Sequence, residues 1–200
     1  MIYHTYNTEA FVLGGVPAGE SSRFMYLFTR DLGLVGARAQ NVRSVSSKLR
    51  YSLEDFSHSA VSLVRGKNSW RLVNAAPQKN FFSLFRERAD MLELSVRVLK
   101  TVRMLVAGEE VNRELFQILS AGFTFLESNA AYFLTDDIKN VEAIFVLRIL
   151  DNLGYFGSHE DLGEFVIEPT LWTPELVTAM GDKRRDAIVA INGALKASNL

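Results

Sequence analysis

The chain of 200 residues contains no cysteine. Disulfide bonds and thiolate metal sites are therefore excluded, and a reducing compartment suits the sequence. The best apolar run, Ala143 to Leu150, contains Arg148 and is far shorter than the roughly 20 residues that cross a bilayer. Residues 1–20 also lack the cationic start and apolar core of a secretory signal. We therefore expect a cytoplasmic protein that does not act at a membrane.

Catalytic motifs are scarce as well. The glycine-rich segment from Gly14 to Ser21 has the glycine spacing of a phosphate-binding loop, but Glu20 stands where that loop needs a lysine. A carboxylate at this position repels phosphates, and no long helical pattern follows it. We therefore expect a strand connection here and no nucleotide cofactor.

Metal and nucleophile patterns are equally weak. The three histidines are far apart in the sequence: His4, His58 and His159. None of them has neighbouring ligands at the spacing of a metal motif. The paired carboxylates Glu109–Glu110 and Asp136–Asp137 fall at the starts of predicted helices, where the helix dipole favours negative charge. We predict no catalytic residue, no metal site and no cofactor, and hence a protein that is not an enzyme.

Residues 6–76 show the two-residue period of β-strands. Phe24, Tyr26 and Phe28 alternate with Met25 and Leu27, so both faces of this strand are apolar, as in a small barrel. Five strands are predicted, near residues 6–14, 21–30, 33–43, 55–65 and 69–76. Five short strands in so few residues are typical of an OB-fold, a small barrel that often binds oligonucleotides.

A helical period replaces the strand period after Pro77, which we expect to end the last strand. Apolar residues then recur at three- and four-residue steps from Phe81 to Leu105. Further helices are predicted over residues 111–126, 135–153, 173–181 and 182–197, with Thr135 as a cap and Gly181 as a stop. The predicted class is α+β, with an N-terminal five-stranded OB-fold β-barrel in residues 1–78 and an all-α helical domain in residues 79–200.

Charge is unevenly distributed along the chain. Residues 1–80 contain ten Lys and Arg against five Asp and Glu, whereas residues 81–200 contain twelve against eighteen. The segment from residue 38 to residue 50 holds cations and no acid: Arg38, Arg43, Lys48 and Arg50. Clustered cations displace counterions from a polyanion, so phosphates are the expected partners of this segment.

We expect further cations of the barrel to share this phosphate-binding surface. They are Arg23, Arg65, Lys67 and Arg71. Tyr51 and Trp70 are candidate stacking platforms for unpaired bases, although core packing is an equally good interpretation of Trp70. Nothing in this pattern reads base edges, so weak sequence preference is expected.

Several sequence blocks in residues 6–76 follow one another in a specific order and spacing. They are TEAFVL at 8–13, GESSR at 19–23, LFTRDLGL at 27–34, AQNVR at 39–43, SKLR at 47–50, LVRG at 63–66 and WRL at 70–72. This series resembles the N-terminal domain of RecO, a bacterial family of recombination mediators. The helical part is similar only in short stretches, at Leu153–Gly154 and in residues 193–198.

The resemblance implies a non-enzymatic DNA-repair protein with an OB-fold and a helical domain. RecO proteins bind single- and double-stranded DNA and anneal complementary strands. They act with RecR and with the acidic tail of single-stranded-DNA-binding protein to load recombinase. Four arginines of the helical part are candidates for gripping the carboxylate of that tail, although helix-surface pairing explains them as well: Arg97, Arg103, Arg113 and Arg148.

The chain departs from the family pattern in three places. Asn41 stands where the family usually has a glycine, and asparagine tolerates a positive φ better than most residues. The segment from Gly154 to Glu168 has none of the cysteines that form a zinc site in many members, and the chain is short for the family. The short, acidic helical half motivates an alternative function, an OB-fold protein-interaction scaffold without significant DNA binding.

Overall fold

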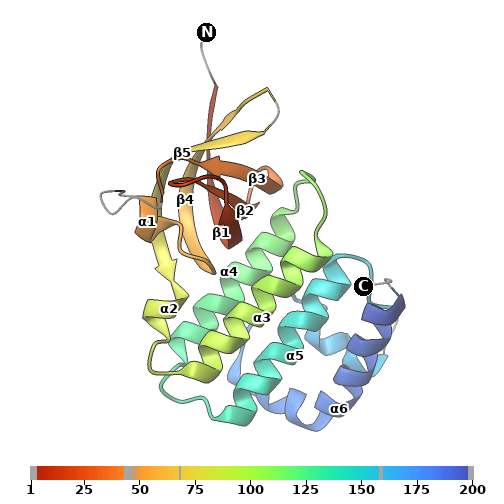
Figure 1. The fold of residues 1–200 in the computed structure, drawn as a ribbon. Coiled ribbons are helices and arrows are strands. Elements are labelled where there is room, and N and C mark those ends of the chain that lie inside the picture. The colour runs from red at the N-terminus through yellow and green to blue at the C-terminus, as the bar shows by residue number, and fades with distance from the viewer. Residues whose placement is uncertain (1–3, 43–46, 48, 68, 158–159, 198–200) are drawn as a thin grey trace. The chain divides into compact units, whose positions relative to one another are not determined.

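The computed structural model describes residues 4–42, 47, 49–67, 69–157 and 160–197. The chain divides into two compact units (Figure 1). Most of the first unit is coloured from red to yellow, and most of the second from green to blue. The first unit comprises residues 1–86 together with residues 106–113, and the second comprises residues 87–105 and 114–200. The chain thus returns once to the first unit after the first long helix has begun the second.

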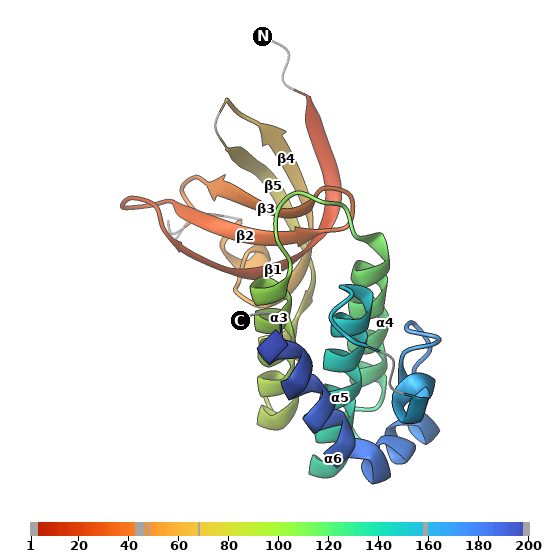
Figure 2. The same cartoon turned by 90° about the vertical axis from the view of Figure 1, so that its right-hand side faces the viewer.

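The first unit is a closed five-stranded barrel (Figures 1 and 2). Its strands are β1 (Thr5–Pro17), β2 (Arg23–Thr29), β3 (Gly33–Ala39), β4 (Ser57–Arg65) and β5 (Trp70–Asn80). Their order around the barrel is β1-β2-β3-β5-β4; β3 and β5 are parallel, and the other neighbours are antiparallel. The OB-like barrel and the α+β class predicted from the sequence are confirmed.

Strand alternation fills the barrel interior with apolar side chains. The most buried of them include Ala10, Val12, Met25, Leu27, Val35, Ala37, Val61 and Leu63. Trp70 belongs to this interior as well, with 4% of its surface exposed. Of the two interpretations that the sequence left open for Trp70, core packing is therefore correct, and its ring is no platform for bases.

The strand ends differ in detail from the prediction. Pro77 does not end the last strand, because β5 continues to Asn80 with Pro77 opposite Ser59. The register shifts between His58 and Ser59, and proline is tolerated in a strand at such an irregularity. A short helix that the sequence pattern did not indicate, α1 (Leu49–Ser52), precedes β4, and α2 (Phe81–Leu84) follows β5.

The second unit consists of helices (Figures 1 and 2). They are α3 (Ala89–Leu105), α4 (Arg113–Ser128), α5 (Thr135–Asn152), the 3-10 helix η1 (Glu160–Phe165) and α6 (Pro174–Ala197). Helix α5 packs against α3 and α6 and buries residues around most of its circumference, so it forms the centre of the unit. Gly122 of α4 lies against the rings of Phe145 and Trp172, where a Cβ atom has no room.

One expected helix boundary and one expected helix cap are wrong. Gly181 does not end a helix, because α6 runs unbroken from Pro174 to Ala197 and keeps Met180 and Ala187 buried on one face. A glycine inside a helix costs only about 1 kcal/mol, which this packing offsets. Thr135 is not the cap of α5; the backbone N–H of Leu134 instead donates to Asp137 Oδ2 at 2.8 Å.

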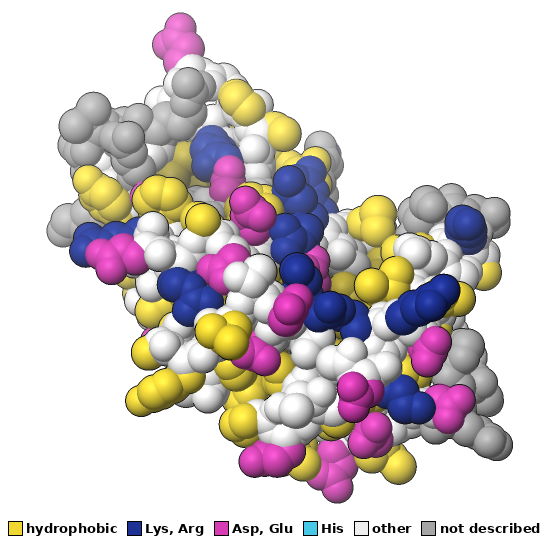
Figure 3. All heavy atoms as spheres, turned by 90° about the horizontal axis from the view of Figure 1, so that it is seen from below, with side chains coloured by type: hydrophobic (Ala, Val, Ile, Leu, Met, Phe, Trp, Pro, Cys, Tyr) yellow, Lys and Arg dark blue, Asp and Glu magenta, His cyan; other side chains and the backbone are white. Residues whose placement is uncertain are grey.

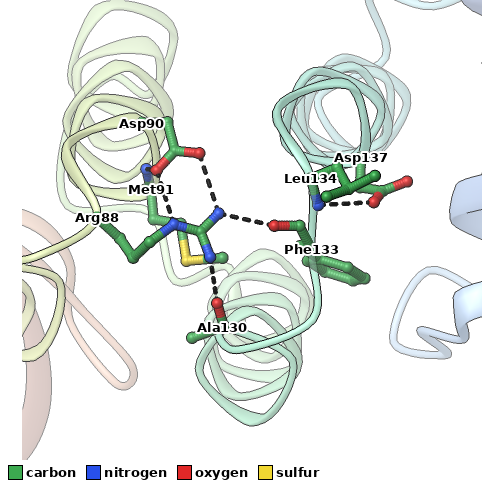
Figure 4. Close-up of polar contacts among 7 residues, drawn as sticks. All are labelled: Arg88, Asp90, Met91, Ala130, Phe133, Leu134 and Asp137. Atoms are coloured by element: carbon green, nitrogen blue, oxygen red, sulfur yellow. Dashed lines mark hydrogen bonds and ion pairs between the residues drawn. The ribbon is translucent and has the colours of Figure 1, made fainter.

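Arg88 ties the start of α3 to the turn between α4 and α5 (Figure 4). Its guanidinium makes two hydrogen bonds to the Asp90 carboxylate, at 3.1 and 3.0 Å, and also donates to the carbonyl oxygens of Ala130 and Phe133. The hydrogen bonds from Arg88 lower the pKa of Asp90 below its usual value. This arginine therefore has a structural role, with its charge compensated at close range.

Arg148 holds the segment between η1 and α6. It is 1% exposed and donates to the carbonyl oxygens of Phe165 at 2.7 Å and Leu171 at 2.8 Å. Its guanidinium also lies 4.3 Å from the ring centroid of Trp172, while Nη1 is buried without a hydrogen-bond partner among the described residues. Burial lowers the pKa of Arg148 to about 10.

Candidate nucleic-acid interface

Two arginines lie side by side on the outside of the barrel. Arg38 of β3 is the register partner of Arg71 of the parallel strand β5, and both are exposed. Because neighbouring strands are about 4.8 Å apart and paired residues share a face, the two guanidinium groups reach the same outer surface. We call Arg38 and Arg71 the arginine pair.

No carboxylate neutralises the arginine pair within the described residues. Arg38 makes one long hydrogen bond, from Nη2 to the Ala18 carbonyl oxygen at 3.3 Å, and Arg71 forms no ion pair in that part of the chain. Like charges directly opposite each other in a sheet are destabilising. The pair therefore weakens the fold slightly and leaves two positive charges available to an external anion.

Aromatic side chains continue this surface onto β2. Phe24 is the register partner of Arg38, and Tyr26 is the partner of Gly36 one step along. Both rings are partly exposed and meet edge to face, with centroids 5.5 Å apart and planes at 80°. The sequence pattern indicates a strand with two apolar faces, as in a small barrel, but does not single out these two rings as surface features. Their shared face with Arg38 depends on the strand register, which the sequence does not provide.

Arg23 and Arg65 differ from the arginine pair because carboxylates already compensate their charges. Arg23 donates from Nη2 to both oxygens of Asp55 at 2.9 Å and to the Gly15 carbonyl oxygen at 3.0 Å. Arg65 forms an ion pair with Glu109 and lies 4.9 Å from the ring centroid of Trp70. These two predicted DNA contacts are therefore held by the barrel's own structure.

Glu109 has a double role in the returning loop of residues 106–113. It accepts hydrogen bonds from Arg65 and, at 2.9 Å, from Trp70 Nε1. Burial raises the pKa of Glu109, but these two hydrogen bonds outweigh it and leave the pKa below its usual value. Glu109 was expected at the start of a helix; it lies instead before α4, and its partners rather than a helix dipole account for its position.

The structure describes only some of the remaining residues that were predicted to contact DNA. Lys67 is exposed in the β4–β5 turn and has no ion-pair partner in the part of the chain that the structure describes. Arg43 and Lys48 lie outside the described residues, as does the side chain of Arg50 in α1. Tyr51, the other candidate platform, is 68% exposed on α1. The role of each of these residues in binding stays a prediction.

The four arginines proposed from the sequence for a peptide carboxylate have different surroundings. Arg97 forms ion pairs with Glu142 and Glu93, and Arg113, the last residue of the first unit, forms an ion pair with Asp31 of the same unit. Arg148 is buried, as described above, and Arg103 lies near the end of α3. Helix-surface pairing, the other interpretation of these arginines, describes Arg97, whose i,i+4 ion pair with Glu93 is 3.3 Å long.

Cations of the helical unit are generally accompanied by acids. Figure 3 shows one face of the molecule, on which Asp and Glu side chains lie close to many of the Lys and Arg side chains. Ion pairs occupy Arg88, Arg97, Lys139, Lys183 and Arg184. This surface therefore offers less uncompensated positive charge than the arginine pair does.

Comparison with known proteins points to one family. The family model for the recombination protein O N terminal matches residues 1–81, which include the whole barrel. The DNA repair protein RecO of Heliobacterium modesticaldum is 31% identical over 156 residues, which cover 75% of this chain and 52% of the relative. Residues 1–81 thus match the N-terminal domain of the RecO family, and most of the chain is similar to RecO proteins.

Other RecO proteins show the same pattern. The relative from Dehalococcoides mccartyi strain 195 is 28% identical over 76% of this chain and 57% of its own length. The relative from Thermodesulfovibrio yellowstonii is 26% identical over 79% of this chain and 61% of its own length. The chain thus spans little more than half the length of the curated RecO proteins that it matches.

Two local features bear on the family pattern. Asn41, at the usual glycine position, has φ of 55°, so the left-handed turn is retained, and its Oδ1 accepts a hydrogen bond of 2.9 Å from Ser21. The glycine-rich segment that mimics a phosphate loop lies largely in β1 and leads into β2, which confirms it as a strand connection. Of the helices described, none has the length and apolar composition needed to cross a membrane.

Proposed function

We propose that this RecO-like protein is a recombination mediator that binds the backbone of single- and double-stranded DNA on the outer face of β3 and β5. It anneals complementary strands and, with a RecR-like protein and the tail of single-stranded-DNA-binding protein, helps to load recombinase in the cytoplasm. It catalyses no covalent step and needs no cofactor.

The observation that carries the proposal is the arginine pair, which no carboxylate in the described part of the chain neutralises. Phosphate oxygens accept charge-assisted hydrogen bonds from guanidinium groups, and each neutralised phosphate releases counterions. Lys67 lies in the turn before β5, and the cations of residues 43–50 would extend the same surface. A surface of this kind contacts phosphates of any sequence, so the binding is expected to be insensitive to base order.

Annealing follows from the same charges. Two complementary strands repel each other through their phosphates, and cations that screen both strands lower this barrier to pairing. With about four phosphates neutralised, affinity should fall roughly a hundred-fold between 50 and 200 mM salt. Strand annealing should weaken over the same range, because it depends on the same contacts.

The test is a double charge reversal, Arg38→Glu with Arg71→Glu, assayed by fluorescence anisotropy with single-stranded and duplex oligonucleotides. We expect affinity for both forms to fall about a hundred-fold at low salt, because two phosphate contacts are replaced by repulsion. The matched control is Lys100→Glu with Lys196→Glu, which changes the net charge equally at exposed positions of α3 and α6.

The outcomes separate the two functions under consideration. Loss of binding in the barrel variant alone supports the proposal. Equal loss in both variants would show that net charge, not the arginine pair, determines binding, and would overturn the site. Absence of measurable DNA binding by the unmodified protein at low salt would favour the alternative, a protein-interaction scaffold.

A further inference from the structure

We propose that Phe24 and Tyr26 form a stacking platform for unpaired bases, so that the barrel prefers single-stranded DNA to duplex. The inference rests on the proposed function, because it places the bases beside phosphates held by the arginine pair. It goes further by assigning a strand preference to two side chains that make no contact with phosphates.

Register places the platform and the cations in one row across three strands. Phe24 of β2 is opposite Arg38 of β3, which is in turn beside Arg71 of β5. Paired residues share a face, and neighbouring strands are about 4.8 Å apart, so the row is roughly 10 Å long from Phe24 to Arg71. An apolar ring at one end of such a row suits a base, and two guanidinium groups at the other end suit the backbone.

Gly36 gives the Phe24 ring its position. A Cβ atom at Gly36 would lie 2.4 Å from Cζ of Phe24, so the ring extends over β3 where this residue has no side chain. Tyr26, the register partner of Gly36, meets the same ring edge to face. The two rings therefore form a small, supported aromatic surface on the outside of the barrel.

The interior of the barrel does not need these rings. The buried core on this strand is supplied by Met25 and Leu27, each 0% exposed, whereas Phe24 and Tyr26 remain partly exposed on the opposite face. Aromatic side chains that stay at the surface beside uncompensated arginines are the combination that single-strand binders use, since every base has a face that can stack. Bases in a duplex are already stacked and paired, so duplex DNA gains little from the rings.

Charge decides between DNA and a protein as the occupant. An apolar patch alone would suit a protein partner equally well, but the patch here adjoins two positive charges that no carboxylate of the described residues neutralises. A single strand supplies both the apolar faces and the negative charge that this row lacks. Among the other aromatic residues, Trp70 is inside the barrel, and Tyr51 lies on α1 rather than in this row.

The test is the double variant Phe24→Leu with Tyr26→Leu, which keeps apolar bulk and removes both rings. We expect affinity for labelled oligo(dT) to fall about ten- to hundred-fold, with affinity for a duplex of equal length changed less than about threefold. The swap Phe24→Tyr with Tyr26→Phe keeps two stacking rings and should retain the oligo(dT) affinity of the unmodified protein.

Two controls keep the result interpretable. Tyr132→Leu removes a ring that is 80% exposed in the helical unit and should leave both affinities unchanged. Photocrosslinking of the unmodified protein to oligo(dT) carrying 5-iodouracil should attach the base to Phe24 or Tyr26 in peptides identified by mass spectrometry. The crosslink needs no variant, so it remains decisive if the double variant folds poorly.

The failure of this inference differs from the failure of the proposed function. Equal losses for oligo(dT) and duplex, no loss for either, or crosslinks confined to Tyr51 would overturn the stacking platform while leaving backbone binding by the arginine pair intact. Failure of the unmodified protein to bind any DNA would overturn both.

Discussion

The barrel and the helical unit treat their arginines in opposite ways. In the helical unit, Arg88 and Arg97 each have a carboxylate within 3.0 Å, and Arg148 is enclosed by carbonyl oxygens and the Trp172 ring. On the barrel, Arg38 and Arg71 stand side by side without a carboxylate among the described residues. The arginines of the helical unit hold its elements together, whereas the arginine pair places two like charges side by side, with one long hydrogen bond from Arg38 to the Ala18 carbonyl oxygen.

A second contrast lies within the barrel itself. Arg23 and Arg65 were predicted to bind DNA together with the arginine pair. In the structure, however, Arg23 forms an ion pair with Asp55, and Arg65 forms one with Glu109. Surface ion pairs of this kind contribute roughly 0–1 kcal/mol to stability, but they reduce the charge that an external phosphate meets. The number of cations in the sequence therefore overstates the positive charge that this surface offers to DNA. Whether a cation can bind a phosphate depends on whether a carboxylate already pairs with it.

The variant Arg71→Glu should break the contrast most strongly. The introduced carboxylate would face Arg38 and give it the kind of partner that the helical arginines have. We expect DNA affinity to fall about thirtyfold at 50 mM salt, less than for the double reversal, because one phosphate contact is lost and the remaining arginine is paired with the new carboxylate. Stability should rise by about 0.5 kcal/mol as repulsion becomes attraction.

Chemical denaturation and anisotropy on the same preparation measure both quantities. Lys100→Glu, which makes the same change in net charge on α3, serves as the control and should leave both unchanged within error. A large loss of stability in Arg71→Glu would mean that Arg71 is structural and would remove half of the proposed interface.

The variant Arg148→Met should lower the stability of the protein and leave its DNA affinity unchanged. It leaves the carbonyl oxygens of Phe165 and Leu171 without their donor, a loss that removal of a buried charge only partly offsets, so we expect a loss of about 2–3 kcal/mol. Amide hydrogen exchange should increase most in residues 160–173. DNA affinity should not change.

Arg97→Met is the matched control for Arg148→Met. Arg97 is on the same unit, but its side chain is 49% exposed, and its ion pairs are at the surface. The change should therefore cost less than about 1 kcal/mol. If Arg97→Met were the more damaging of the two, the distinction between a buried structural arginine and surface pairs would be wrong.

The sequence predicted much of this arrangement. Alternating apolar residues located five strands, because this pattern depends on residues close together in the chain. The cationic region that the charge balance indicates stays a prediction. The compensation of Arg23 and Arg65 could not be predicted in this way, since Asp55 and Glu109 are 32 and 44 residues away and meet them only in the folded barrel. Helix α6 was divided at Gly181 because local propensity was weighed without the packing that carries the helix through.

His58 adds a pH dependence to the barrel. Burial lowers the pKa of His58 to about 4 from 6.5, with Glu9 opposing and Lys79 adding to the shift. In this window the unfolded chain binds a proton that the folded barrel does not, so stability falls as the pH drops from 6.5 toward 4. At pH 5 the loss attributable to His58 should be about 2 kcal/mol.

Comparison with His58→Phe isolates this contribution. The substitution keeps the ring that stacks on Phe11 at 4.7 Å and removes the titrating group. On going from pH 7 to pH 5, the unfolding free energy of the unmodified protein should fall by about 2 kcal/mol relative to that of His58→Phe. Parallel pH profiles for the two proteins would contradict the assignment of a buried neutral histidine.

The variant Glu109→Gln removes the carboxylate that neutralises Arg65 and should have a smaller effect. The glutamine keeps an oxygen for Trp70 Nε1 and removes the charge that neutralises Arg65. We expect DNA affinity at low salt to rise about threefold. The slope of log affinity against log salt should steepen by less than the value of one phosphate contact, about 0.9. Glu110→Gln makes the same charge change on the neighbouring residue and should leave both nearly unchanged.

The most direct test of the central claim is the dependence of DNA affinity on salt, measured for the unmodified protein and for Arg38→Gln with Arg71→Gln. Each phosphate contact contributes about 0.9 to the slope of log affinity against log salt for duplex DNA, so loss of the pair should reduce the slope by about 1.8. A slope that stays the same would show that Arg38 and Arg71 do not contact phosphates, and the interface would have to lie elsewhere.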